Sequence, residues 1–92
     1  MKDLKNKVAI VTGSSSGVGA ATARLLASMG CHLIINYNSN PNGAESVARE
    51  CQAEGIETLV LKANVSSDDD CKMLASAAVE KWGRIDVLVN NA

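Results

Sequence analysis

The sequence predicts an α/β fold in which one parallel sheet is covered by helices on both faces. The alternation of two kinds of segment supports this fold class. Four short apolar segments alternate with three segments of helical periodicity along the 92 residues. A chain that alternates strands and helices in this way forms a parallel sheet with buried strands. Right-handed crossovers and a doubly wound arrangement give the β-α-β-α-β-α-β chain the strand order 3-2-1-4.

The first two elements are a strand over residues 8–11 and a helix that begins at Val18. The strand is the apolar run Val-Ala-Ile-Val. Gly30 is expected just beyond the end of the helix, where glycine accepts a left-handed conformation. Helical spacing places five residues on the predicted inward face: Val18, Ala21, Leu25, Leu26 and Met29.

The next strand covers residues 31–37 and leads into a polar loop. Asn40 and Pro41 are expected as the N-cap and first residue of the second helix, because proline is favoured at the first helical position. This helix is expected to stop near Gly55. Its predicted inward residues are Ala44, Val47, Ala48 and Cys51.

A third strand over residues 57–62 precedes the last helix, which Ser66 or Ser67 is expected to cap. Three aspartates at 68–70 suit the positive end of this helix. They are interpreted as a solvated helix start and not a metal site, because consecutive residues do not share a helix face. The helix should end at Gly83, before a strand over residues 85–89. Its predicted inward residues are Cys71, Leu74, Ala75, Ala78 and Trp82.

The composition fits one small domain and argues against several classes of partner. Nine basic and ten acidic residues are interspersed, so no basic stripe indicates a nucleic-acid partner. No apolar run is long enough to span a membrane, and the polar start is not a signal peptide. Three widely spaced cysteines without a C-x-x-C pair are expected to be buried thiols, not zinc ligands. Their odd number predicts a cytoplasmic location.

A glycine-rich turn follows the first strand and leads into the first helix. It has the form Thr12-Gly13-x-x-x-Gly17-x-Gly19, with three serines between the first two glycines. A turn without side chains lets phosphates approach the backbone, and the N–H groups of the following helix then bind the anion. The spacing matches neither G-x-G-x-x-G nor the P-loop. Taken by itself, the turn is open to interpretation as a flexible glycine–serine loop.

Two further motifs identify a family resemblance. Asn90-Asn91-Ala92 follows the fourth strand, and Asn64-Val65 follows the third. Together with the glycine pattern, they resemble the T-G-x-x-x-G-x-G, N-N-A-G and D/N-V motifs of the short-chain dehydrogenase/reductase family. The resemblance covers all 92 residues and implies a partial Rossmann-type dinucleotide-binding domain, cut after the fourth strand.

The resemblance implies cofactor-binding roles at three places in the chain. The first loop would hold the pyrophosphate and ribose, the pair after the third strand the adenine, and the last residues the nicotinamide-side ribose. In that order, the residues are Gly13, Ser15, Ser16, Gly17, Val18 and Gly19; Asn64 and Val65; and Asn91 and Ala92. Thr12 and Asn90 are expected to brace the loop and the sheet.

The end of the second strand indicates NADP(H) in preference to NAD(H). An NAD enzyme usually carries an acidic residue there, which binds the ribose 2′-hydroxyl. Here Asn38 and Ser39 offer donors and no carboxylate that would repel a 2′-phosphate. This stretch resembles NADP(H)-preferring members such as the 3-oxoacyl-[acyl-carrier-protein] reductases. Ser16, however, stands where many of those members have arginine.

The family's Tyr-x-x-x-Lys pair and catalytic serine lie downstream of its N-N-A-G motif. The one tyrosine here, Tyr37, is followed four residues later by Pro41. The resemblance therefore implies the cofactor-binding half of a carbonyl or alcohol oxidoreductase, without activity alone. The alternative is a non-catalytic nucleotide-binding or assembly module. A methyltransferase-type domain leaves the Asn90-Asn91-Ala92 motif unexplained.

The predicted strand order leaves the fourth strand at an open edge of the sheet. Its residues are mainly valine and leucine. Exposed apolar edges favour pairing with a strand of another chain. The sequence therefore predicts a homo-oligomer that associates through the fourth-strand side.

Overall fold

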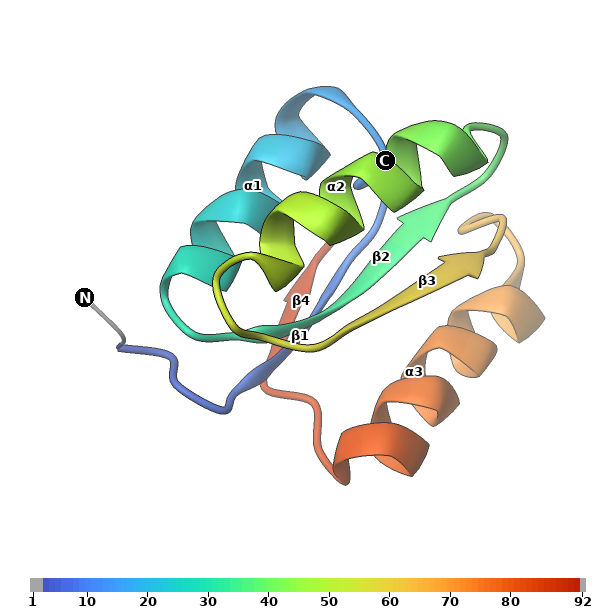
Figure 1. Ribbon diagram of the computed structural model, residues 1–92. Coiled ribbons are helices and arrows are strands. Elements are labelled where there is room, and N and C mark those ends of the chain that lie inside the picture. The colour runs from blue at the N-terminus through green and yellow to red at the C-terminus, as the bar shows by residue number, and fades with distance from the viewer. Residues whose placement is uncertain (1–2, 92) are drawn as a thin grey trace.

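The computed structural model describes residues 3–91 and has the predicted order of elements. In that range the elements are β1 (Val8–Val11), α1 (Gly17–Ser28), β2 (His32–Tyr37), α2 (Pro41–Gln52), β3 (Thr58–Lys62), α3 (Asp68–Trp82) and β4 (Val87–Val89). Figure 1 shows α1 and α2 on one face of the sheet and α3 on the other. None of the helices within residues 3–91 combines the length and apolarity needed to cross a bilayer.

The four strands form one parallel sheet with the order β3-β2-β1-β4, which confirms the predicted Rossmann-type topology. All four carboxyl ends lie along the same edge of the sheet, because the strands are parallel. The segment after β4 therefore lies beside the loop that joins β1 to α1 (Figure 1). The topology thus brings together motifs that are nearly 80 residues apart in the chain.

The two central strands, β1 and β2, are buried on both faces, as continuous apolar strands predict. Alternate residues of β1 and β2 enter different cores, because successive side chains of a strand point to opposite faces. The core under α1 and α2 includes Ala9, Val11, Leu33 and Ile35. The core under α3 includes Val8, Ile10 and Ile34. The short aliphatic residues of both cores let the helices lie close to the sheet.

Helix α1 packs on the sheet through a different face from the one predicted. Val18 and Leu25 are 72% and 61% exposed, and Ala21 is also exposed. The prediction that these three residues face inward is therefore wrong. The buried residues are Gly19, Ala20, Ala23, Leu26 and Ala27. Small side chains allow α1 to approach the sheet closely, so the largest apolar residues do not mark its buried face.

The helix ends agree with the predictions from local sequence. The Asn40 side chain caps α2 by accepting a hydrogen bond from the Gly43 N–H at 3.1 Å. Ser67 is the cap of α3 and accepts from the Asp70 N–H at 3.3 Å. Gly30 follows α1 with a φ of +91°. The four residues predicted to face inward from α2 are all buried.

Helix α3 buries less of its surface than predicted. Leu74 and Ala78 are its buried residues, whereas Cys71 is exposed. The prediction that all three cysteines are buried is therefore wrong for Cys71. Cys31 and Cys51 are fully buried, and burial raises the pKa of each thiol to about 11.

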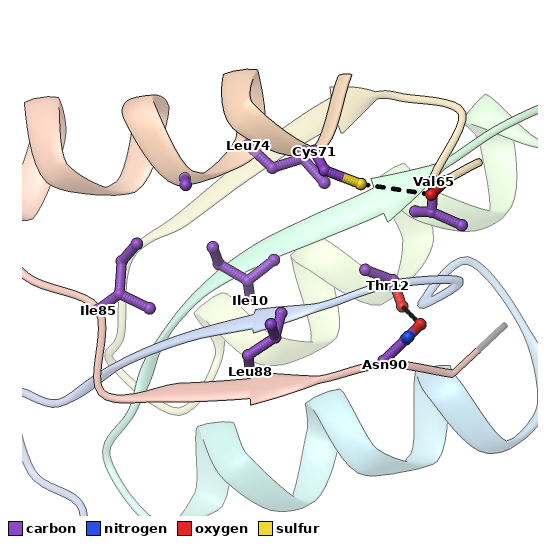
Figure 2. Close-up of a pocket in the computed structure, with 9 residues that line it drawn as sticks. Ile10, Thr12, Val65, Cys71, Leu74, Ile85, Leu88 and Asn90 are labelled. Carbon is purple, nitrogen blue, oxygen red and sulfur yellow. Dashed lines mark hydrogen bonds between the residues drawn. The ribbon is translucent and has the colours of Figure 1, made fainter. Parts of the chain in front are cut away.

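Large apolar side chains of the sheet are exposed at β4. β4 is an edge strand, and Leu88 in its middle is 66% exposed. A groove of about 190 Å³ separates β4 from α3. Figure 2 shows Ile85 and Leu88 along one side of it and Leu74 opposite them. Leu88 therefore belongs both to the edge strand and to the lining of the groove.

Candidate dinucleotide-binding site

The loop from β1 to α1 depends on glycine at two sharp turns. Gly13 and Gly17 have φ values of +60° and +58°, in the left-handed region that other residues rarely adopt. Gly17 is exposed, and a Cβ at this position would meet nothing within 4 Å. The backbone at Gly17 therefore presents an open surface that a phosphate group can approach.

Two other close contacts bring the glycine loop against the segment after β4. A Cβ on Gly13 would lie 2.9 Å from the backbone oxygen of Asn91. A Cβ on Gly19 would overlap the Gly13 carbonyl oxygen and lie 2.7 Å from Nδ2 of Asn91. The absence of side chains at these glycines allows three segments to meet. The structure thus brings together Gly13, Gly19 and Asn91, as the sequence predicts.

The N-terminus of α1 is suited to an anion. Its N-cap, Ser16, has extended backbone angles but makes no side-chain capping hydrogen bond, whereas Asn40 and Ser67 do cap their helices. No acidic residue stands in its first turn. The first N–H groups of a helix lack partners inside the helix, and the helix dipole makes this end positive. The open Gly17 backbone and these features fit a dinucleotide pyrophosphate.

Thr12 connects the end of β1 to the end of β4. Its N–H donates to the Val89 carbonyl at 3.0 Å, and its hydroxyl lies 3.2 Å from Asn90 Oδ1. The same hydroxyl accepts from the Asn91 N–H at 2.9 Å. Figure 2 shows Thr12 and Asn90 pointing toward one another. These contacts match the bracing role expected of Thr12 and Asn90.

Asn36 and Ser14 are part of the site, although the sequence analysis did not select them. Both are buried, at 2% and 0% exposure. Asn36 Oδ1 accepts from the Gly13 N–H at 3.0 Å. The Ser14 N–H donates to the Asn36 carbonyl at 3.1 Å, and the Asn36 N–H donates back to Ser14 Oγ at 2.9 Å. The signal available in the sequence was an amide side chain, Asn36, directly after the apolar run of residues 33–35.

The residues predicted to select the cofactor lie at the carboxyl end of β2. Asn38 and Ser39 are both exposed there, just before the N-terminus of α2. A Cβ on Gly43, in the first turn of α2, would approach the Ser15 backbone oxygen at 2.5 Å. The glycine loop and the start of α2 are therefore neighbours. No acidic residue stands in that first turn either.

The adenine pair after β3 has a local hydrogen-bond arrangement of its own. Asn64 Oδ1 accepts from the Ser66 N–H at 3.0 Å, and the Asn64 N–H donates to Asp70 Oδ2 at 2.7 Å. Val65 lines the groove beside Thr12, from the α3 side (Figure 2). These bonds fix the turn after β3 at the same edge of the sheet. Ala92, the last residue predicted to bind the cofactor, lies outside the described residues.

The glycine loop itself carries no charged side chain. Residues 12–19 consist of threonine, serine, glycine and valine. At the opposite edge of the sheet, the hydrogen bond from Arg84 lowers the pKa of Asp86, and that from Trp82 lowers the pKa of Glu57. Hydroxyl and backbone N–H groups bind an anion but do not transfer protons near neutral pH. The loop is therefore equipped for binding and not for acid–base chemistry.

The sheet order and the glycine loop at its carboxyl edge define a Rossmann-type α/β protein. The family model for short chain dehydrogenase matches residues 7–92. The chain therefore belongs to the short-chain dehydrogenase family, whose members are oxidoreductases that use a dinucleotide cofactor.

Two bacterial proteins are similar in sequence to this chain along its whole length. The chain is 44% identical over 92 residues to an uncharacterized oxidoreductase of Methylorubrum extorquens. It is 42% identical over 92 residues to a 3-oxoacyl-[acyl-carrier-protein] reductase of Synechocystis. Each match covers 100% of this chain and 37% of the relative. The chain thus spans little more than a third of the length of these curated relatives.

Two solved structures also match this chain over about a third of their own length. The hydroxysteroid dehydrogenase of Escherichia coli superposes with a TM-score of 0.88 at 32% identity. The match covers 97% of this chain and 37% of the dehydrogenase. The acetoin dehydrogenase of Enterobacter cloacae gives a TM-score of 0.87 at 36% identity, over 95% of this chain and 34% of that one. The 92 residues therefore have the fold of one part of these enzymes.

Proposed function

We propose that this chain is the cofactor-binding half of an NADP(H)-dependent short-chain dehydrogenase/reductase. The whole enzyme would transfer hydride between the cofactor and a carbonyl or alcohol substrate. The observation that carries the proposal is the open N-terminus of α1. There Gly17 exposes its backbone and Ser16 leaves the first N–H groups of the helix uncapped. A bound nicotinamide cofactor would supply the hydride. The loop and Asn91 would bind and orient the cofactor, and the Thr12 hydroxyl would hold the Asn91 N–H in place.

The preference for NADP(H) is part of the proposal. Asn38 and Ser39 are exposed at the end of β2, where a carboxylate would repel a 2′-phosphate. The start of α2 beside them adds the positive end of a second helix dipole. A 3-oxoacyl-[acyl-carrier-protein] reductase is among the relatives, which supports a carbonyl substrate. Three free cysteines support a cytoplasmic location.

We expect this chain to bind nucleotide without catalysing hydride transfer. Its one tyrosine, Tyr37, is part of β2 and pairs in register with Lys62 of β3. The residue four positions after Tyr37 is Pro41 and not the lysine that accompanies the family's proton donor. The second candidate is a non-catalytic nucleotide-binding or assembly module. It is favoured by the lack of a Tyr-x-x-x-Lys pair in this chain and by the apolar edge of β4.

We also propose that the chain forms a homo-oligomer through β4. The exposed Leu88 and the apolar groove beside it would be covered by a second copy. Backbone groups along the outer side of an edge strand are available to pair with another strand.

A calorimetric titration of the 92-residue chain with NADP⁺, and in parallel with NAD⁺, tests the proposed function. We expect saturable binding that is tighter for NADP⁺. Equal dissociation constants would remove the NADP(H) preference while leaving dinucleotide binding in place. A folded sample that binds neither nucleotide would contradict the proposal. Binding without turnover of carbonyl substrates is expected on either reading, and turnover would refute the predicted inactivity.

A further inference from the structure

The side chain of Asn36 is a buried amide at the end of an apolar strand. The preceding strand residues Leu33, Ile34 and Ile35 are fully buried, and Asn36 is 2% exposed. A buried amide is unfavourable unless hydrogen bonds replace those it makes with water. Among residues 3–91, every buried side-chain nitrogen and oxygen has such a partner. The contacts of Asn36 therefore show what the residue does.

The two ends of this amide bind different segments of the chain. Oδ1 accepts from the Gly13 N–H at 3.0 Å. Nδ2 donates to the Ala63 carbonyl at 3.1 Å and lies 3.3 Å and 3.5 Å from the carbonyls of Tyr37 and Leu61. Asn36 thus ties the glycine loop to the end of β3, across the carboxyl end of β2.

The backbone of Asn36 holds the next residue of the loop. Ser14 exchanges hydrogen bonds with the Asn36 N–H and carbonyl at 2.9 Å and 3.1 Å, and Ser14 Oγ also bonds to the Val11 carbonyl at 2.7 Å. The N–H groups of Gly13 and Ser14 are therefore both directed at Asn36. Gly13, at a φ of +60°, is the point where the loop leaves β1.

We propose that Asn36 is a positioning residue, whose side-chain amide fixes Gly13 and so holds the loop to Gly19 in its phosphate-binding conformation. The inference rests on the proposed dinucleotide binding. Asn36 lies beneath the loop and would not touch the cofactor. The position needs an acceptor for Gly13 and a donor for Ala63 on one short side chain. An amide provides both, whereas an ionised carboxylate provides acceptors alone.

This difference gives a specific test with Asn36→Asp. A neutral aspartic acid has one oxygen that accepts and one O–H that donates, as the amide does. An ionised aspartate would face the carbonyl oxygens of Tyr37, Leu61 and Ala63 and repel a bound pyrophosphate. The hydrogen-bond partners of Asn36 do not titrate. The neighbouring titratable groups are those of Tyr37 and Lys62, which pair in register beside it.

The experiment measures the dissociation constant of NADP⁺ by calorimetry from pH 8 to pH 5.5, as the ratio of variant to wild type. The ratio removes the titration of the ligand itself. For Asn36→Asp we expect a ratio of about ten or more at pH 8, because a buried hydrogen bond is lost, and a fall toward one at pH 5.5. Asn6→Asp is the control, because Asn6 is exposed just before β1, at the opposite edge of the sheet from the glycine loop. Its carboxylate stays ionised throughout, so its ratio should stay near one at every pH.

Binding of ADP and of adenosine separates a role in positioning the loop from a general loss of structure. Asn36→Asp should weaken NADP⁺ and ADP, which carry a pyrophosphate, and leave adenosine unchanged. A ratio near one at pH 8, a ratio that stays high at pH 5.5, or equal losses for adenosine would overturn the inference. If the variant does not fold, the wild type decides the question by a hydrogen-bond scalar coupling.

That coupling joins the Gly13 nitrogen to the side-chain carbonyl carbon of Asn36 and is measured by NMR without ligand. A resolved coupling supports the inference. Its absence, with couplings resolved between β1 and β2, would overturn it. A wild type that shows the coupling but binds no NADP⁺ refutes the proposed function and leaves Asn36 as the anchor of the loop.

Discussion

At the residue scale, Ser16 and Gly17 make the start of α1 different from the starts of the other two described helices. Asn40 and Ser67 accept hydrogen bonds from N–H groups of their own first turns, and Ser16 does not. A capping side chain and a phosphate would use the same N–H groups. An uncapped N-terminus is therefore consistent with a helix whose cap is its ligand.

Ser16→Asp should weaken the binding of NADP⁺ without lowering the free energy of unfolding. Aspartate is as good an N-cap as serine and favours the positive helix end, so the free energy of unfolding should stay the same or rise by up to about 1 kcal/mol. The new carboxylate should raise the dissociation constant of NADP⁺ by about tenfold or more, because it occupies and repels the phosphate position. Calorimetry and urea unfolding measure the two effects.

Ser67→Asp is the matched control, because Ser67 caps α3 and lies outside the glycine loop. It should leave the affinity for NADP⁺ unchanged. If Ser16→Asp binds NADP⁺ as tightly as the wild type, the pyrophosphate does not lie at α1.

The loop glycines should differ in how much they tolerate alanine. At Gly17 a Cβ meets nothing within 4 Å, so Gly17→Ala should lower the free energy of unfolding by about 1–2 kcal/mol, through the left-handed backbone alone. At Gly19 the Cβ would overlap the Gly13 carbonyl oxygen and approach Asn91, which adds about 1–3 kcal/mol of overpacking to an ordinary helical φ. Urea unfolding measures both variants.

Backbone atoms cannot move away as a flexible side chain can, so Gly19→Ala should also detach the segment after β4 from the loop. Hydrogen exchange of the Asn91 N–H, which is bonded to Thr12, reports this detachment. Unchanged exchange at Asn91 in Gly19→Ala would argue against the close packing of these segments.

At the scale of the elements, the three thiols should differ in reactivity. Cys31 precedes β2 and Cys51 lies in α2; both are fully buried, and burial raises their pKa values to about 11. Cys71 is exposed on α3. A thiol reagent added at pH 8 to native protein that is dilute enough to be monomeric should therefore label Cys71 and spare the other two until urea unfolds the chain.

Mass spectrometry of the labelled peptides identifies the reactive cysteine. Cys71→Ser should remove the rapid phase of labelling. Rapid labelling of Cys51 in native protein would mean that α2 opens easily from the sheet.

The ion pair just before β4 should make the free energy of unfolding depend on pH in the acid range. The Arg84 guanidinium, and then the Val8 N–H, hold the pKa of Asp86 below its ordinary value of 3.8. A carboxyl whose pKa is lowered by folding stabilises the folded state above its unfolded pKa. This stabilisation is lost as the pH falls through the lower folded value. The free energy of unfolding should therefore decrease from about pH 4 downward.

Asp86→Asn should flatten that part of the curve, because amide nitrogen and oxygen do not titrate. Urea unfolding between pH 2 and pH 6, followed by Trp82 fluorescence, measures it. Glu45→Gln, at an exposed position of α2, should keep the wild-type slope. Parallel curves for wild type and Asp86→Asn would contradict the expected coupling between Arg84 and Asp86.

At the scale of the whole molecule, β4 and its groove are the expected interface. Leu88→Lys places a charge in the middle of the edge strand, where it opposes pairing with another chain. Leu88 is 66% exposed, so the free energy of unfolding of the single chain should change by no more than about 0.5 kcal/mol. Light scattering at high concentration should show an oligomer for the wild type and 9.6 kDa for the variant.

Leu25→Lys is the control, since Leu25 is exposed to a similar degree but lies on α1. It should keep the oligomer. A wild type that stays at 9.6 kDa would rule out assembly through β4.

The sequence by itself determined the order of the strands, the helix caps and the position of the glycine loop. The strand order follows from the handedness of the crossovers. The caps and the loop depend on local chemistry, such as the Asn40–Pro41 helix start and glycine at a positive φ. Only the tertiary structure decided which face of α1 is buried and which cysteines are covered. It also decided that Asn36 anchors Gly13, because the two residues meet across a sheet after 23 residues of chain. Such contacts depend on how closely the elements approach one another, which periodicity along one segment does not specify.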